Sequence, residues 1–336
     1  MSERGHVRLM SGMRPTGRLH LGHLVGVLEQ WVSFCATHDT YFEIADLHAL
    51  TTGFAETEQL RGNVHEMVLD WLAAGVDPAR STIYLQSLVP QISELHTLLS
   101  MIVPVSWLQR VPTYKDQIEA LGPEIATYGF LGYPLLQLVD IAIFRGEVVP
   151  VGKDQLSHLE FGRDVVRRFN HLYGPTLVEP QPTLSEFPDV PGTDGRKMSK
   201  SYNNHIAIAD DAATTTAKVR SMLTDPLKIR RNDPGRPEIC PVFSLHKIAT
   251  PAAALPGIAS ACRGGTLGCV ACKADLAANL NAYLQPVRAR RAAIDPQAVE
   301  EIIAEGSARA SAVAAETLAD VKEAMHLTAA HAPVRS

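Results

Sequence analysis

The stretch VRLMSGMRPTGRLHLGHLVG, residues 7–26, indicates how the chain begins to fold. VRLMSG has the apolar character of a short strand, and the strand runs into a turn at RPTG. A helix is expected next, because Leu24, Val27, Leu28 and Trp31 lie at i, i+3, i+4 and i+7 and form one apolar face. The stretch therefore predicts a strand, a turn and a helix, which is the first unit of an α/β fold.

The same alternation continues through the first two-thirds of the chain. TYFEIAD, STIYLQS and EVVPVG have the pattern of strands, and ISELHTLLSMI has the pattern of a helix. Alternating strands and helices predict a parallel, doubly wound sheet with helices on both faces, here over residues 1–204. Ala-rich helical segments follow, so we expect an all-α C-terminal domain over 205–328 and a flexible tail over 329–336. The stretch EEIIAEGSARASAVAAETLADVKEAMHL predicts a long helix interrupted near Gly306–Ser307.

Length and composition limit the class of protein. A chain of 336 residues favours two domains, and 46% hydrophobic with 20% charged residues is ordinary for a globular protein. The net charge of −5 does not mark a strongly basic nucleic-acid binder, although a local basic stripe remains compatible with it. The N-terminus lacks the apolar region of a signal peptide, and no apolar run approaches a membrane span. We therefore expect a cytoplasmic protein that does not bind membranes.

RLHLGH lies at the predicted start of the first helix, directly after the first strand. Ligands of open parallel sheets bind where strands end and helices begin, and helix N-termini favour phosphate groups. The imidazoles of His20 and His23 are placed to donate hydrogen bonds to a phosphate, and Gly22 leaves room for a flat base on the backbone. The motif also occurs by chance, so alone it is weak.

GRKMSKSYN, residues 195–203, is a second candidate motif. Its Lys197 and Lys200 would neutralise the charge that develops on a departing pyrophosphate, an electrostatic contribution that is often the largest in catalysis. The alternative is a solvated basic loop, which is the usual position of lysines.

Together the two motifs are far more specific. HLGH followed about 180 residues later by KMSKS resembles the signature of the class I aminoacyl-tRNA synthetases. Over residues 9–325, the stretches SGMRPTGRLHLGHLVG, ADLHALTT, GYPLLQLVDIAIF, VPVGKDQLSHLEFGRDVVRRFN and PGTDGRKMSKS are similar to the tryptophanyl family. The resemblance implies a Rossmann-like catalytic domain that uses ATP and Mg²⁺ to form tryptophanyl-adenylate and then charges tRNA(Trp). It also implies a homodimer, a helical dimerisation and substrate segment at about 105–145, and an anticodon-binding role for 205–328.

The tryptophan site follows from one helix. In YPLLQLVD, Tyr133, Gln137 and Asp140 lie at i, i+4 and i+7 and share a face. By resemblance Asp140 accepts the indole N–H, while Tyr133 and Gln155 hold the α-ammonium group. Without the resemblance, Tyr133 and Val151 would read as core residues. The tryptophan-binding residues that the resemblance implies are Met10, His48, Tyr133, Gln137, Asp140, Val151 and Gln155.

The resemblance also assigns the ATP site and the catalytic residues. Arg14 stands where many relatives have Gln, and it adds a phosphate-binding charge. Lys153 stands where many have an acidic residue, which reverses a charge next to Asp154, the residue placed to bind the ribose. The ATP-binding residues are Arg14, Pro15, Thr16, Gly22, His23, Gly152, Lys153, Asp154, Val190, Lys197, Met198, Ser199, Lys200 and Ser201. The catalytic residues are His20, His23, Lys197 and Lys200.

Four of the five cysteines form an array within the predicted helical domain. Cys240, Cys262, Cys269 and Cys272 are separated by 21, six and two residues, a set that suits zinc or an iron–sulfur cluster. The spacing alone favours structural zinc, and a disulfide is least expected. A subset of tryptophanyl enzymes carries a similar array around a [4Fe–4S] cluster, so the resemblance favours that cluster, with Zn²⁺ as the alternative. Cys35 lies outside the array and is expected to be a buried apolar residue.

Three alternatives remain at this stage. The spacing Tyr-x3-Gln-x2-Asp also occurs in tyrosyl enzymes, where the carboxylate accepts a phenol hydroxyl; ADLHALTT and PVGKDQLSHLEFGRD favour tryptophan. A tRNA-independent nucleotidyltransferase could use the same first motif, but it would not need the long helical C-terminal part. A non-catalytic RNA-binding paralogue is disfavoured because both motifs are intact.

Overall fold

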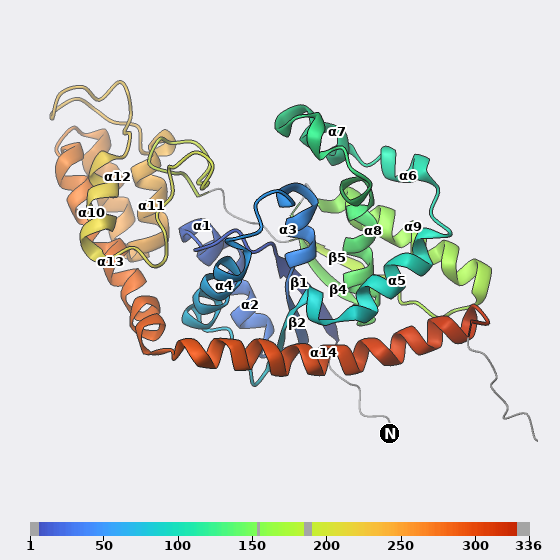
Figure 1. Cartoon of the computed structure of the whole chain (residues 1–336). Helices are drawn as coiled ribbons and strands as arrows, with labels where there is room; N and C mark the ends of the chain where they lie inside the picture. Colours follow the sequence, from blue (N-terminus) through green and yellow to red (C-terminus); the bar gives the residue numbers. More distant parts are fainter. Residues whose placement is uncertain (1–6, 153–154, 185–189, 328–336) are drawn as a thin grey trace, which may run out of the picture.

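The computed structural model describes residues 7–152, 155–184 and 190–327. Parallel strands form one sheet in the order β3-β2-β1-β4-β5 (Figure 1). Since the order reverses between β1 and β4, a ligand crevice is expected at their carboxyl ends. The predicted doubly wound α/β fold is confirmed. The strands are β1 (Arg8–Met13), β2 (Asp39–Ile44), β3 (Ser81–Leu85), β4 (Val148–Val151) and β5 (Gln181–Leu184).

Alternate strand residues build a core on each face of the sheet. Leu9 and Phe42 point into one cluster, which includes α2 (Glu29–Phe34) and α4 (Leu60–Ala74). Met10 and Tyr41 point into the other, which includes α5 (Pro90–Ser100), α8 (Tyr128–Ala142) and α9 (Leu156–Tyr173). Because both faces are covered, the central strands are apolar on both sides.

The first helical region is irregular where RLHLGH lies. It consists of α1 (Leu21–His23), a π-helical turn η1 (Leu24–Leu28) and then α2. Short π-helical segments often mark functional sites, which agrees with the motif at its start. α3 (Asp46–Gly53) follows β2 directly.

The helical segment expected at about 105–145 is found between α5 and β4. It contains α6 (Val105–Gln109), α7 (Pro112–Leu121), the 3-10 turn η3 (Pro123–Ile125) and α8. Thr127 caps α8, because its side chain accepts a hydrogen bond from the Phe130 N–H.

A group of C-terminal helices lies on one side of the sheet (left in Figure 1). It contains α10 (Ala212–Ser221), η5 (Pro237–Ile239), α11 (Pro241–Ala249), η6 (Ala252–Ala254), α12 (Leu255–Arg263) and α13 (Cys269–Ala293). α13 packs against α10, α11 and, at its far end, α4. None of the described helices is long and apolar enough to cross a membrane.

The last helix, α14 (Pro296–Ala324), differs from expectation in two ways. It runs without a break through Gly306–Ser307, and it packs along β3, not within the group of α10–α13. A Cβ on Gly306 would lie 1.8 Å from the Ile83 carbonyl oxygen, and the Leu85 N–H donates to Ser307 Oγ at 3.0 Å. Gly306 and Ser307, which predicted a helix break, are therefore the residues through which α14 contacts the edge strand β3. The expected helical domain over 205–328 thus divides, with α14 packed on the sheet.

Candidate active site

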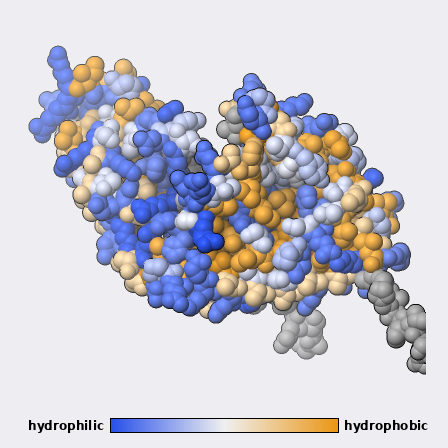
Figure 2. All heavy atoms as spheres, viewed as in Figure 1, coloured by the Kyte–Doolittle hydropathy of each residue, from blue (hydrophilic) through white to orange (hydrophobic). Residues whose placement is uncertain are grey.

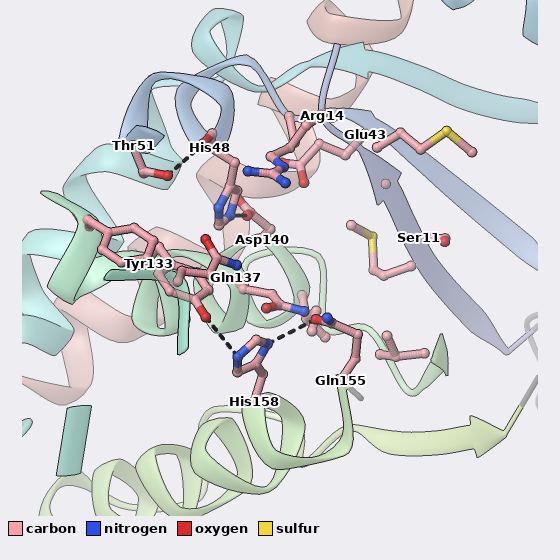
Figure 3. Close-up of a pocket in the computed structure, with 18 residues that line it drawn as sticks. Ser11, Arg14, Glu43, His48, Thr51, Tyr133, Gln137, Asp140, Gln155 and His158 are labelled. Atoms are coloured by element: carbon pink, nitrogen blue, oxygen red, sulfur yellow. Dashed lines mark hydrogen bonds and ion pairs between the residues drawn. The ribbon is translucent and has the colours of Figure 1, made fainter. Parts of the chain in front are cut away.

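The cavity that adjoins the sheet's carboxyl edge has a volume of about 370 Å³. It opens beside the C-terminal halves of β1 and β2 and against α8 (Figure 3). Val151, predicted to pack on the substrate ring, is buried in the adjoining core and is not among the lining residues, whereas Val149 is. The lining residues are Met10, Ser11, Gly12, Met13, Arg14, Glu43, Ala45, His48, Thr51, Gln117, Phe130, Tyr133, Gln137, Asp140, Ile141, Val149, Gln155 and His158.

Asp140 is a buried carboxylate in this cavity, whose lining is both polar and apolar. Its side chain is nearly fully buried, and Gln86 Nε2 donates to both of its oxygens at 2.9 and 3.1 Å. His48 Nε2 lies 3.0 Å from Asp140 Oδ2, and Figure 3 shows the two side chains facing each other. Gln86 also accepts from the N–H groups of Leu47 and His48 through its Oε1. The carboxylate is therefore fixed by a buried amide that is itself fixed by the start of α3.

Two residues of this arrangement were not predicted from the sequence. Gln86 is fully buried just after β3, and Glu43 is buried near the end of β2. Burial and the neighbouring Asp140 raise the pKa of Glu43 well above its ordinary value, which favours the protonated form of this carboxyl group. Both residues are polar and lie at the carboxyl end of an apolar strand, which is where parallel sheets bind ligands. This position was the signal in the sequence that could have identified them.

A second polar chain lies across the cavity from Asp140. Tyr133 Oη is 2.9 Å from His158 Nε2, and His158 Nδ1 is 2.9 Å from Gln155 Oε1 (Figure 3). Thr113 Oγ1 also contacts His158 Nε2 at 2.5 Å. His158, which sequence reasoning missed, thereby orients two residues that were predicted to hold the α-ammonium group. Oxygen atoms placed in this way can accept hydrogen bonds from an ammonium group.

The two histidines of RLHLGH are buried together at the start of α1. Their ring centroids are 3.8 Å apart, and the His20 N–H donates to His23 Nδ1 at 3.2 Å. Burial lowers the pKa of His20 to about 3 and that of His23 to about 4, with Lys200 and His205 adding to the effect. Both imidazoles are neutral at pH 7, so each offers an N–H donor and an acceptor. His20 Nδ1 has no hydrogen-bond partner among the described residues.

We expect acidification to weaken the fold through these imidazoles. The pKa values of both imidazoles in the folded state lie below the unfolded value of about 6.5. Between these values the unfolded state therefore binds more protons than the folded state. The stability they contribute is present above pH 6.5 and is lost as the pH falls toward 3, at roughly 1–2 kcal/mol for each imidazole by pH 5. Thermal unfolding should show a smaller fall in Tm between pH 7 and pH 5 for His20→Asn than for the wild type. His171→Asn, on the exposed side of α9, is the matched control, and equal falls in all three proteins would contradict the expectation.

The second motif forms a compact loop built on a buried asparagine. The Met198 N–H donates to the Val190 carbonyl oxygen at 2.8 Å, and Asn204 bonds to Asp194, to the Lys197 carbonyl oxygen and to the Ser199 N–H. A Cβ on Gly192 would lie 2.3 Å from the Asn204 side chain, so this position requires glycine. The backbone of the loop is therefore fixed, while Lys200 extends from it.

The two motifs meet through Lys200. Its Nζ donates to the Thr16 carbonyl oxygen at 2.7 Å, to Thr16 Oγ1 at 3.1 Å and to the Gly17 carbonyl oxygen at 3.2 Å. Burial lowers the pKa of Lys200. The chain after the loop also pairs with the first motif, because the Leu21 N–H donates to the Ile206 carbonyl oxygen at 2.9 Å. An ammonium group thus lies on the turn that precedes the histidines.

The other residues predicted to bind ATP are distributed around this junction. Arg14 lines the cavity, and Val190 is buried 3.7 Å from where a Cβ on Gly22 would lie. Gly152 follows β4, the strand next to β1. Lys153 and Asp154 lie outside the described residues.

The four predicted metal ligands converge on one small cavity. Cys240, Cys262, Cys269 and Cys272 line a space of about 20 Å³ together with Lys228 and four other residues. Burial, followed by the other three thiols, raises the pKa of Cys272 to about 12. Within the described ranges, no group of three or more His, Cys, Asp or Glu is arranged as a metal site. The thiols are thus brought together, but their arrangement is not that of a preformed centre.

Comparison with known proteins agrees with this geometry. The profile of the family described as tRNA synthetases class I (W and Y) matches residues 2–285. The chain belongs to this family of class I tRNA synthetases.

Several relatives that are more than 30% identical to the chain are tryptophan enzymes. Tryptophan–tRNA ligase from Aquifex aeolicus is 43% identical, with 96% of this chain and 100% of the relative covered, and the enzyme from Thermotoga maritima is 44% identical, with 96% and 99% covered. The crystal structure of tryptophanyl-tRNA synthetase from Campylobacter jejuni, complexed with ADP and tryptophan, has a TM-score of 0.87 at 31% identity, covering 95% of this chain and all of that one. Within the family the chain belongs with the tryptophan–tRNA ligases.

Proposed function

We propose that the chain activates L-tryptophan with ATP and transfers the amino acid to tRNA(Trp). The contact of Lys200 with the Thr16–Gly17 turn, beside the cavity that holds Asp140, is the observation that carries this proposal. A triphosphate bound at the start of α1 would lie between the two motifs, and an amino acid in the cavity would lie next to it. This placement would let the tryptophan carboxylate approach the α-phosphate of ATP in line.

The reaction then has two steps. A tryptophan carboxylate oxygen attacks the α-phosphorus of ATP, the bond from that phosphorus to the bridging oxygen breaks, and pyrophosphate leaves with the electron pair. A ribose hydroxyl of the tRNA next attacks the carbonyl carbon, and AMP leaves as the hydroxyl proton is lost. His20 and His23 would donate hydrogen bonds to phosphate oxygens, and Lys197 and Lys200 would oppose the charge on pyrophosphate. Mg²⁺ would enter with ATP and share that charge.

Exchange of labelled pyrophosphate into ATP tests the first step. Stimulation by tryptophan and not by tyrosine supports the proposal, followed by charging of tRNA(Trp) in the presence of all three substrates. Stimulation by tyrosine alone would contradict the proposal and indicate a tyrosyl-tRNA synthetase. Adenylate formation without charging of any tRNA would favour a tRNA-independent nucleotidyltransferase.

The helical group of α10–α13 would read the anticodon. Loops at the end of this group expose Arg230 and Arg231, whose guanidinium groups are suited to RNA phosphates. Arg236 forms a salt bridge with Asp225, and Arg263 forms one with Glu238. These two arginines would therefore stabilise the loops and would not contact RNA. Loss of charging with retained pyrophosphate exchange in an Arg230 and Arg231 double alanine variant would support this assignment.

The cysteine cavity would hold a [4Fe–4S] cluster, with Zn²⁺ as the alternative. The donor set suits either group, because four thiols face one space and burial together with the other three thiols disfavours ionisation of Cys272 in the absence of a cation. A space of about 20 Å³ holds little more than one water, so the loops that carry the cysteines must separate to admit a cluster. When bound, the group would staple the loop before α11 to the start of α13.

Anaerobic purification should therefore give a brown protein with about four irons and four sulfides per chain. Cys272→Ser should remove the colour and the iron. Cys35→Ser is the matched control, because Cys35 is buried at the end of α2 and outside the array, and it should keep both. A colourless protein with one zinc per chain would end the cluster proposal and support the alternative.

A second copy of the chain would cover the apolar face over α3, α5 and α8. Figure 2 shows hydrophobic residues gathered there, around a groove of about 540 Å³. Phe54, Met101, Val105 and Tyr128 are each at least half exposed on or beside this face. Monomers rarely expose such patches, which supports a homodimer. Sedimentation of Met101→Glu with Val105→Glu should then show a monomer, and an unchanged mass would exclude this face.

A further inference from the structure

The peptide of Leu19, one residue before the first motif histidine, is held on both sides. Its N–H donates to Asp70 Oδ2 at 2.7 Å, and its carbonyl oxygen accepts from the Ile208 N–H at 2.9 Å. Asp70 lies on α4, and Ile208 lies just after the second motif. The position of His20 is therefore set by two elements distant in sequence.

Asp70 is in turn held by an arginine from the helical part of the chain. Arg291 Nε donates to Asp70 Oδ1 at 2.8 Å, and Arg291 Nη2 donates to Glu66 Oε2 at 2.6 Å. Arg18 Nε also donates to Glu66 Oε2 at 2.7 Å. A single guanidinium thus bonds both acids of α4, and those acids bond the two residues that precede His20.

Asp70 depends on this guanidinium because it has no exposure to solvent. Burial raises the pKa of Asp70, and the Leu19 N–H and Arg291 act against that rise. A buried carboxylate without its cation is strongly unfavourable, so the side chain would protonate or move. Either change alters the acceptor that fixes the Leu19 N–H.

Arg291 lies in the last turn of α13, whose first residue is Cys269. Figure 1 shows α13 running from the cysteine end of the helical group toward α4. Arg290, the preceding residue, contacts the end of α4 differently, because it donates to the carbonyl oxygens of Ala73 and Ala74. Two adjacent arginines therefore serve different purposes at one helix junction.

On the basis of the proposed function, we propose that Arg291 is a positioning residue for adenylate formation. It holds Asp70, Asp70 holds the Leu19 peptide, and that peptide places His20 and His23 against the phosphates of ATP. The helical part of the chain thereby contributes to the first step of the reaction, which requires no tRNA.

Tryptophan-dependent pyrophosphate exchange by the full chain tests this assignment. Arg291→Gln should raise KM for ATP about tenfold, with KM for tryptophan changed less than twofold. Arg291→Lys keeps a cation and should recover part of the loss. Arg290→Gln is the matched control, because it removes an arginine from the same helix junction without touching Asp70, and it should leave both KM values unchanged.

A double-variant cycle separates positioning from general support of the fold. If Arg291 acts through Asp70, Asp70→Asn combined with Arg291→Gln should raise KM for ATP no more than either change alone. Multiplying effects, or equal effects of Arg290→Gln and Arg291→Gln, would overturn the proposal. If Arg291→Gln does not fold, Arg291→Lys and Asp70→Asn decide by the same readout. A wild-type chain without tryptophan-dependent exchange would instead refute the proposed function.

Discussion

Lys200→Ala lowers kcat for tryptophan-dependent pyrophosphate exchange by an expected 10²–10³-fold, roughly the cost of removing one preorganised charge donor. The Lys200 ammonium lies on the turn before the first motif, where its donors now contact Thr16 and Gly17. Turning from these carbonyl groups to a triphosphate requires only rotation of a flexible side chain. The charge that leaves with pyrophosphate appears in the transition state, so the loss should fall on kcat more than on KM for tryptophan.

Two further variants make this result specific. Lys200→Arg keeps the charge and should recover part of the rate. Lys247→Ala removes a lysine from the exposed side of α11, distant in sequence from both motifs, and should change kcat less than twofold. If Lys200→Ala retained full kcat, the second motif would not carry the chemistry.

Asp140→Asn should raise KM for tryptophan about 10- to 100-fold while leaving KM for ATP within twofold. The carboxylate can accept from Gln86, from His48 and from an incoming indole N–H at the same time. The amide has one oxygen in its place, and its NH₂ group must face one of these donors. The substrate therefore loses a charged acceptor and meets a site with an unpaired donor.

Substrate analogues extend this test. A tryptophan analogue with benzothiophene in place of indole has nearly the same shape but no N–H, so the wild type should reject it strongly. Asp140→Asn should discriminate much less between tryptophan and this analogue, because it no longer offers a charged acceptor to the indole N–H. Asp164→Asn, on the surface of α9, is the control for a charge change of the same size. Equal discrimination by all three proteins would remove Asp140 from indole recognition.

Much of the fold could be predicted because the signals were local. Strands β1 to β4, the first helical region and α5 follow from apolar periodicity, and the two motifs fall where a parallel sheet binds ligands. β5 was missed, since its sequence, QPTL, contains Pro182 and is too short to show alternation. As an edge strand, β5 needs fewer ladder hydrogen bonds than a central strand and so tolerates the proline.

Contacts between residues that are distant in sequence could not be predicted from periodicity, because periodicity reports only local structure. Gln86 and Glu43 read as ordinary strand-end residues until the structure places them beside Asp140. Six of the seven residues assigned to tryptophan line the cavity, and that list came from resemblance and not from spacing alone. The role of Arg291 likewise depends on a contact 221 residues apart in the chain.

The packing of α14 on β3 has a consequence for synthesis on the ribosome. β3 is an outer strand, and the helix that covers it is made about 210 residues later, which is the separation of Leu85 from Pro296. Until α14 emerges, the nascent sheet has an open side that is able to pair with strands of neighbouring chains. We therefore expect a chain that terminates before Pro296 to be prone to aggregation through this uncovered edge.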